Sequence, residues 1–154
     1  MEAIRNMLEE IKANEKLSIN KVVVGVLKNE IIEFLENQNI TIHTKEIYLT
    51  HKGLSHLARD SKRKRGAGLS EDDILRIPEI IKSPSAVVFD SKKNKLNLLY
   101  YDKSISCEKF VKIVIDTKSY DKKLGKITLI KTAGYIVEAN LKDKYYIPIE
   151  MGGR

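Results

Sequence analysis

From residue 86 onward the sequence alternates short β-rich runs with polar turns, and this pattern constrains the fold more than any other feature. The intervening segments SKKN, TKSYDKKLG and NLKD contain the glycine, asparagine, aspartate and serine that are typical of turns. Five runs are rich in β-branched and aromatic residues: AVVFD, KLNLLYYD, KFVKIVID, KITLIKTAGYIVEA and KYYIPIE. Runs of this length with short connections predict an antiparallel sheet of four to five strands.

Helical periodicity dominates the first half of the chain. Apolar residues recur at helical spacing over residues 2–13 and 28–39, and again after Thr50, which is a suitable N-cap. Ser70, with an aspartate three residues later, resembles a capping box, and Pro78 is expected to end that helix and start another. Because helices precede the main run of strands, we expect an α+β fold. Its N-terminal helices would pack on one face of a C-terminal, mostly antiparallel four- to five-stranded sheet.

The length of the chain indicates how many domains it can form, and its charge indicates which partners it favours. The 154 residues suffice for a single domain with a buried core. A formal net charge of +7 favours polyanions, with nucleic acid first and an anionic membrane second. No apolar run is long enough to cross a bilayer, and the acidic, amphipathic N-terminus does not resemble a secretory signal. We therefore expect a cytoplasmic protein without a membrane partner.

A single cysteine narrows the chemistry further. With Cys107 alone, an intramolecular disulfide and a cysteine-based zinc site are both excluded. The neighbouring apolar run FVKIVI predicts that this thiol is buried. No acid-rich metal motif and no glycine-rich phosphate loop is visible.

The stretch LTHKGLSHLARDSKRKRGAG, residues 49–68, carries the strongest functional signal. On a helical wheel that advances 100° per residue, His51 lies about 140° from His56, so a metal site built from this histidine pair is not expected. The polar residues that gather on one side of the wheel are Lys52, His56, Arg59 and Arg63.

His56, Arg59 and Arg63 follow an i, i+3, i+7 pattern and so form one stripe. Neighbouring cations favour the neutral imidazole that a general base requires, and arginines bind phosphate well. The alternative is that these residues are the solvent face of an amphipathic helix.

The order of several segments resembles the phage-associated barnase–EndoU–colicin–RelE-like nucleases. The resemblance rests on EIYLTHKGLSHLARD, followed by ILRIPEIIKSPSAVVFD and a late KTAGYIV. It covers residues 44–150, which we interpret as a nuclease-like core, with residues 1–43 as an N-terminal extension or accessory α/β segment. It implies an α+β fold and metal-independent RNA cleavage in which the ribose 2′-hydroxyl attacks the adjacent phosphate, with no metal and no cofactor.

The resemblance also implies roles for particular residues. His56 matches the histidine of an H-x-x-R-like element and Arg59 its basic partner, while Thr132 falls at the late-strand hydroxyl position and Tyr135 is the aromatic partner. Many relatives have a second histidine directly after the basic residue, and here that position is Asp60. No residue is therefore assigned as the general acid, and His51 is kept only as a second-choice candidate for that role. The residues expected to bind the substrate are Lys52, Arg63 and Lys131.

The expected partners are RNA, with tRNA among the candidates, and an immunity or antitoxin protein, since relatives occur in toxins, phages and mobile elements. The alternative reading is a non-catalytic nucleic-acid-binding or protein-interaction module on the same fold. The tyrosines of NLLYYD and KYYIP are either packing residues or platforms for bases.

Overall fold

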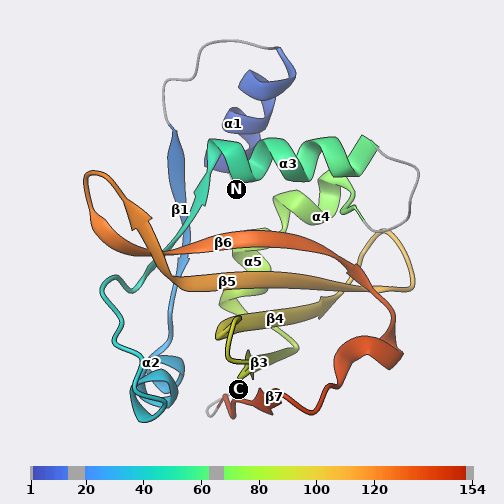
Figure 1. The fold of residues 1–154 in the computed structure, drawn as a ribbon. Helices are drawn as coiled ribbons and strands as arrows, with labels where there is room; N and C mark the ends of the chain where they lie inside the picture. Colours follow the sequence, from blue (N-terminus) through green and yellow to red (C-terminus); the bar gives the residue numbers. More distant parts are fainter. Residues whose placement is uncertain (1, 14–19, 63–67, 152–154) are drawn as a thin grey trace.

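The computed structural model describes residues 2–13, 20–62 and 68–151, although not the side chains of residues 60–62. Figure 1 shows one extended sheet with helices behind it and above it. In chain order the elements are α1 (Glu2–Lys12), β1 (Lys21–Val26), α2 (Asn29–Asn37), β2 (Glu46–Thr50), α3 (His51–Lys62), α4 (Glu71–Leu75), α5 (Ile77–Lys82), β3 (Ala86–Asp90), β4 (Asn97–Lys103), β5 (Phe110–Asp121), β6 (Gly125–Ile136), the 3₁₀ helix η1 (Glu138–Leu141) and β7 (Tyr146–Pro148).

The sheet has seven strands in the order β1-β2-β6-β5-β4-β3-β7. All pairs are antiparallel except β2 with β6, where Ile47 pairs with Thr128 and Tyr48 with Leu129. The α+β class and the mostly antiparallel sheet are confirmed. The sheet is wider than expected, because β1 and β2 extend it beyond β6 and β7 extends it beyond β3.

The alternation of side chains along β5 gives the sheet two different faces. Val111, Ile113 and Ile115 are fully buried in the main core, on what we call the inner face. Lys112 and Val114 lie between them and point to the opposite, outer face. The helices supply the other side of the core with buried apolar residues, among them Ile4, Leu35, Leu54, Leu57, Ile74 and Ile80.

Helix α3 begins where β2 ends and lies beside β6, as Figure 1 shows. Thr50 caps this helix, since its Oγ1 accepts a hydrogen bond of 3.0 Å from the Gly53 N–H. Gly53 allows a close approach: a Cβ atom there would lie 3.2 Å from Thr50 Oγ1 and 3.9 Å from the Ile130 carbonyl oxygen. The β2–β6 pairing ends at Leu129, and α3 lies next to the part of β6 that follows.

The expected start of α4 is confirmed, because Ser70 Oγ accepts a 3.1 Å hydrogen bond from the Asp73 N–H. Pro78 also acts as expected. It lies in the first turn of α5, where its missing N–H costs nothing, and α4 ends just before it.

Three expectations from the sequence are wrong in detail. The β-branched and aromatic residues that alternate with polar ones in ITIHTKEIYLT predict an extended run from residue 40, but a strand forms only from Glu46. The predicted turn TKSYDKKLG is mostly strand, because β5 continues to Asp121 and β6 starts at Gly125, whose positive φ of 79° suits glycine. Cys107 is exposed rather than buried, since it lies in the loop before the apolar run and not within β5.

Candidate active site

His56 and Arg59 are in direct contact on the exposed side of α3. Arg59 Nη2 lies 2.8 Å from His56 Nδ1, and both residues are exposed. A guanidinium only donates hydrogen bonds, so Nδ1 is the acceptor and, in the neutral ring, Nε2 carries the proton. The helical spacing of three residues thus produces a pair whose imidazole is held by its arginine.

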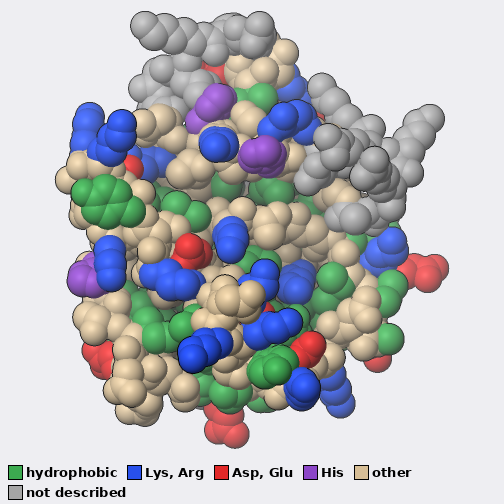
Figure 2. Space-filling model, viewed as in Figure 1, with side chains coloured by type: hydrophobic (Ala, Val, Ile, Leu, Met, Phe, Trp, Pro, Cys, Tyr) green, Lys and Arg blue, Asp and Glu red, His purple; other side chains and the backbone are tan. Residues whose placement is uncertain are grey.

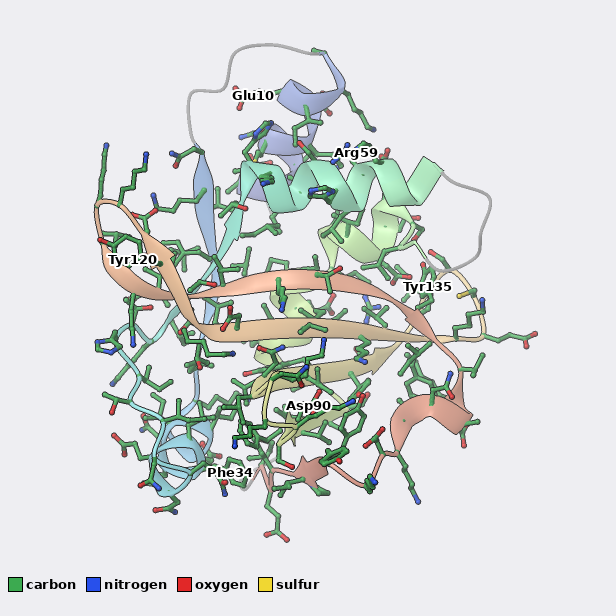
Figure 3. All side chains as sticks on the ribbon, in the orientation of Figure 1. Glu10, Phe34, Arg59, Asp90, Tyr120 and Tyr135 are labelled. Carbon is green, nitrogen blue, oxygen red and sulfur yellow. The ribbon has the colours of Figure 1, made fainter. Side chains whose placement is uncertain are left out.

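Arg59 also borders a small pocket between three helices. The pocket has a volume of about 290 Å³ and is lined by Ile11, Lys12, Ser55, Ala58, Arg59 and Glu71. In Figure 3 Arg59 lies on the side of α3 that is nearer to α1. An ion pair of 2.7 Å joins Lys12 and Glu71 at this pocket. Helix α1 was expected as a helix, but its place beside Arg59 had no signal in the sequence.

A β-bulge in β6 presents Lys131 and Thr132 to solvent. Ile130 pairs with Ile115, and Thr132 pairs with Val114, so Lys131 is the extra residue between two consecutive pairs. Both Lys131 and Thr132 are exposed. Bulges of this kind redirect side chains and recur near active sites. The register shift cannot be read from the sequence, because the alternation of KITLIKTAGYIV is compatible with a regular strand.

Tyr135 points to the other face of the sheet. It pairs with Val111, an inner-face residue, whereas Thr132 pairs with outer-face Val114. The Tyr135 hydroxyl donates to Asp73 Oδ2 at 2.5 Å and accepts from the Ser70 N–H at 3.0 Å. Figure 3 shows Tyr135 toward the end of β6, away from Arg59. Within the described residues, no hydrogen bond joins His56 or Arg59 to Thr132 or Tyr135.

Tyr135 belongs to a buried polar network centred on Asp73, which is completely buried. Asp73 accepts hydrogen bonds from Ser104 Oγ at 2.6 Å and from Arg76 Nη1 at 3.0 Å. Burial alone would raise the pKa of Asp73, but hydrogen bonds from Ser104, Tyr135 and Arg76 and from the Ile105 N–H lower it below its ordinary value. This carboxylate is therefore charged and fully partnered.

The start of α3 forms a second small pocket. Its volume is about 270 Å³, and it is lined by Asn20, Lys21, Thr50, His51, Lys52 and Asp121. Lys52 is exposed there, while His51 Nε2 lies 3.3 Å from Ser55 Oγ. Lys52 and His56 are thus one helical turn apart on α3, and Arg63 lies outside the described residues.

Lysine and arginine side chains cover much of the molecular face seen in Figure 2, and histidines mark its upper part, where α3 lies. Lys112 and Lys131 belong to this cationic surface by their position on β5 and β6. Lys118 is less available, since it forms a 3.0 Å ion pair with Asp116 and donates to the Lys95 carbonyl.

No cluster of three or more histidine, cysteine, aspartate or glutamate side chains in the described part of the chain is arranged to hold a metal ion. No helix there is long and apolar enough to cross a membrane.

The helices packed on one face of a mostly antiparallel sheet, together with an exposed histidine–arginine pair and a cationic opposite face, define an α+β protein of the small nuclease type. The family comparison gives the same result, since the model of the phage-Barnase-EndoU-ColicinE5/D-RelE like nuclease3 family matches residues 21–144. The chain belongs to this nuclease family, and the resemblance seen in the sequence is confirmed.

One curated relative is a protein of Kluyveromyces lactis named "Probable DNA-directed RNA polymerase". It is 31% identical over 157 aligned residues, which cover 92% of this chain but only 14% of the relative. The likeness therefore concerns one part of a much longer protein. No solved structure matches this chain.

Proposed function

We propose that this nuclease cleaves RNA without a metal ion, by attack of the ribose 2′-hydroxyl on the adjacent phosphate. The observation that carries the proposal is the hydrogen-bonded pair of His56 and Arg59, exposed on a helix that lies beside the cationic face of β6. Such a pair supplies the base and the phosphate-binding cation that cyclising cleavage requires.

In the proposed reaction the substrate first competes for the arginine. A phosphate group binds Arg59 more strongly than a neutral imidazole does, because the hydrogen bonds are then charge-assisted on both sides. When Arg59 turns to the phosphate, His56 Nδ1 is free to accept a proton. The pair is thus inactive as a base until the substrate is bound.

His56 Nδ1 then takes the proton of the 2′-hydroxyl, and the 2′-oxygen forms a bond to phosphorus. The bond from phosphorus to the 5′-oxygen breaks with its electron pair, and a water molecule protonates the leaving oxygen. The hydroxide that remains takes the proton from His56, which restores the water and the base. The products are a 2′,3′-cyclic phosphate and a 5′-hydroxyl end. Water serves as the proton source in this proposal because the position after Arg59 is Asp60 rather than histidine.

The remaining expected residues receive binding roles. Lys131 and Thr132 are exposed at the bulge and are suited to bind phosphate oxygens, as is Lys52 at the start of α3. A direct role for Tyr135 would require its bonds to Asp73 and Ser70 to break. We therefore assign Tyr135 to holding β6 against α4.

The test is cleavage of a diverse RNA pool, including tRNA, in the presence of EDTA. His56→Ala is expected to lower the rate about 10²- to 10⁴-fold, as loss of a general base does. Arg59→Ala should lower it as well, while His43→Ala is the control, because His43 is an exposed histidine outside α3. Equal rates for all variants, or products without cyclic phosphate, would overturn the proposal.

A second function is favoured by one specific observation, namely that His56 Nδ1 is occupied by Arg59. If RNA does not displace this arginine, the protein binds nucleic acid without cutting it. That outcome predicts strongly salt-dependent RNA binding with no strand scission. An acidic immunity or antitoxin protein would compete for the same cationic surface, and it is tested by adding RNA to the preformed complex.

A further inference from the structure

An apolar pocket lies on the outer face of the sheet, two strands away from Thr132. It has a volume of about 430 Å³, within the range of roughly 300–1,000 Å³ that small ligands occupy in proteins. Its floor is formed by sheet residues, and its other wall by the segment that carries η1 and β7. The lining consists of Ser85, Ala86, Val88, Tyr101, Phe110, Leu141, Lys142, Asp143, Tyr146 and Pro148.

The pocket and the proposed cleavage site lie on the same face of the sheet and are linked by residues paired across neighbouring strands. Tyr101 pairs with Lys112 across β4 and β5, and Lys112 pairs with Gly134 of β6. Thr132 lies on the same face, one row further along. Two strand spacings amount to about 10 Å. A nucleotide next to the cleaved phosphate can therefore reach the pocket without leaving the outer face.

The Tyr101 hydroxyl is a buried polar group that lacks a hydrogen bond of normal geometry. Tyr101 is only 3% exposed, and its hydroxyl lies close to Tyr146 without meeting the geometry of a hydrogen bond to any described residue. Buried hydroxyls are nearly always hydrogen-bonded, and leaving one unpaired costs about 1–3 kcal/mol. Burial, together with Tyr146 and Asp90, raises the pKa of Tyr101, so the group stays a neutral donor. A ligand that moves Tyr146 aside and presents a hydrogen-bonding edge would satisfy it.

A cation without an anionic partner stands beside the pocket. Lys112 Nζ lies 5.8 Å from the centre of the Tyr146 ring and donates a hydrogen bond of 3.4 Å to the Tyr146 hydroxyl. Within the described residues Lys112 forms no ion pair, and Lys142 is exposed at the pocket. Aromatic rings, a buried hydroxyl and an ammonium group without an ionic partner among the described residues are features that bind a base and its phosphate.

We infer that this pocket binds a nucleobase of the RNA strand, with the phosphate of that nucleotide on Lys112. The inference rests on the proposed function for the identity of the polymer. Phe110 and Tyr146 enclose the planar ring, and the Tyr101 hydroxyl binds an atom of its edge. The pocket thereby selects the nucleotide next to the cleavage site, because a base that leaves the hydroxyl unpaired binds more weakly.

The test titrates the protein with the four ribonucleoside 3′-monophosphates and with ribose 3-phosphate, which lacks a base, and follows tyrosine NMR signals. At least one nucleotide should bind more tightly than ribose 3-phosphate. Ala86→Phe, which fills the pocket, should weaken that binding at least about tenfold. Tyr101→Phe should weaken it about three- to tenfold while leaving the protein at least as stable, since it removes an unpaired hydroxyl.

Tyr120→Phe is the matched control, because Tyr120 is 75% exposed and lies at the far end of β5. Equal binding of ribose 3-phosphate and all nucleotides, or unchanged binding by Ala86→Phe, would overturn the inference. The two proposals fail separately. Cleavage that depends on His56 without base-dependent binding overturns the pocket alone, whereas base-dependent binding without cleavage overturns the cleavage proposal alone.

Discussion

Two arginines of this protein, Arg76 and Arg59, differ in their exposure and in their ionic partners. Arg76 binds Asp73 at 3.0 Å and Asp102 at 2.9 Å, and its side chain is only 15% exposed. Arg59 is exposed, and its hydrogen-bond partner is the imidazole of His56. The first arginine has its charge neutralised by the protein. The second forms no ion pair with any described residue, which suits it to binding an anion rather than supporting the fold.

Because Arg76 is neutralised by two carboxylates and Arg59 is not, we expect the largest loss of stability from changes in the Asp73 network. Asp73→Ala should lower the free energy of unfolding by about 3–5 kcal/mol, because Arg76 loses a buried partner. Urea denaturation measures this. The matched control is Asp72→Ala, an exposed neighbour in the same helical turn, which should cost less than about 1 kcal/mol. Similar losses for the two variants would show that the network does not support the fold.

A smaller loss of stability is expected for Tyr135→Phe. Removal of this hydroxyl breaks the bond to Asp73 and leaves the Ser70 N–H without its acceptor, so stability should fall by about 1–3 kcal/mol. At a temperature where the variant is folded, RNA cleavage should remain near that of the wild type. A rate more than about tenfold lower would instead place Tyr135 in contact with the substrate.

The charge of Asp73 also makes stability depend on pH. Its pKa is lower in the folded protein than its ordinary value, so its contribution is fully present above about pH 4 and is lost as pH falls through the folded pKa. Unfolding free energies measured from neutral to acidic pH should therefore decline in acid. Asp73→Asn should weaken this decline. It should not abolish it, because hydrogen bonds from Lys118 and Ser119 hold the pKa of the half-buried Asp116 below its ordinary value against the opposing effect of burial.

The smallest effect on stability is expected at the other arginine. Arg59→Ala should change the free energy of unfolding by no more than about 0.5 kcal/mol, because the residue is exposed and its hydrogen-bond partner is also exposed. The same variant should reduce the slope of log affinity for single-stranded RNA against log salt by about 0.7. An unchanged slope would mean that Arg59 does not contact phosphate.

The sequence predicted the local elements well because their signals are local. The Ser70 cap and the break at Pro78 depend on residues within one or two helical turns, and both are found as expected. The buried set Val111, Ile113 and Ile115 follows from strand alternation alone. The pairing of His56 with Arg59 likewise follows from helical spacing.

The features that escaped prediction depend on how distant segments meet. Which face Thr132 and Tyr135 occupy depends on the register of β6 against β5, and the bulge at Lys131 shifts that register. The parallel contact of β2 with β6 could not be inferred from the pattern of either strand. The position of α1 beside Arg59 and the pocket under η1 have the same origin, since both are set by tertiary packing.

The parallel ladder between β2 and β6 also affects when the chain can complete the surface beside α3 during its synthesis. Thr44, which precedes β2, is hydrogen-bonded to Thr128 of this ladder, although the two residues lie 84 positions apart. Contacts of such long range form slowly and late, because the chain between them must first be ordered. Helix α3 precedes β6 in the chain and meets it only through this closure. A ribosome-bound chain that ends before β6 would therefore carry His56 and Arg59 without Lys131 and Thr132.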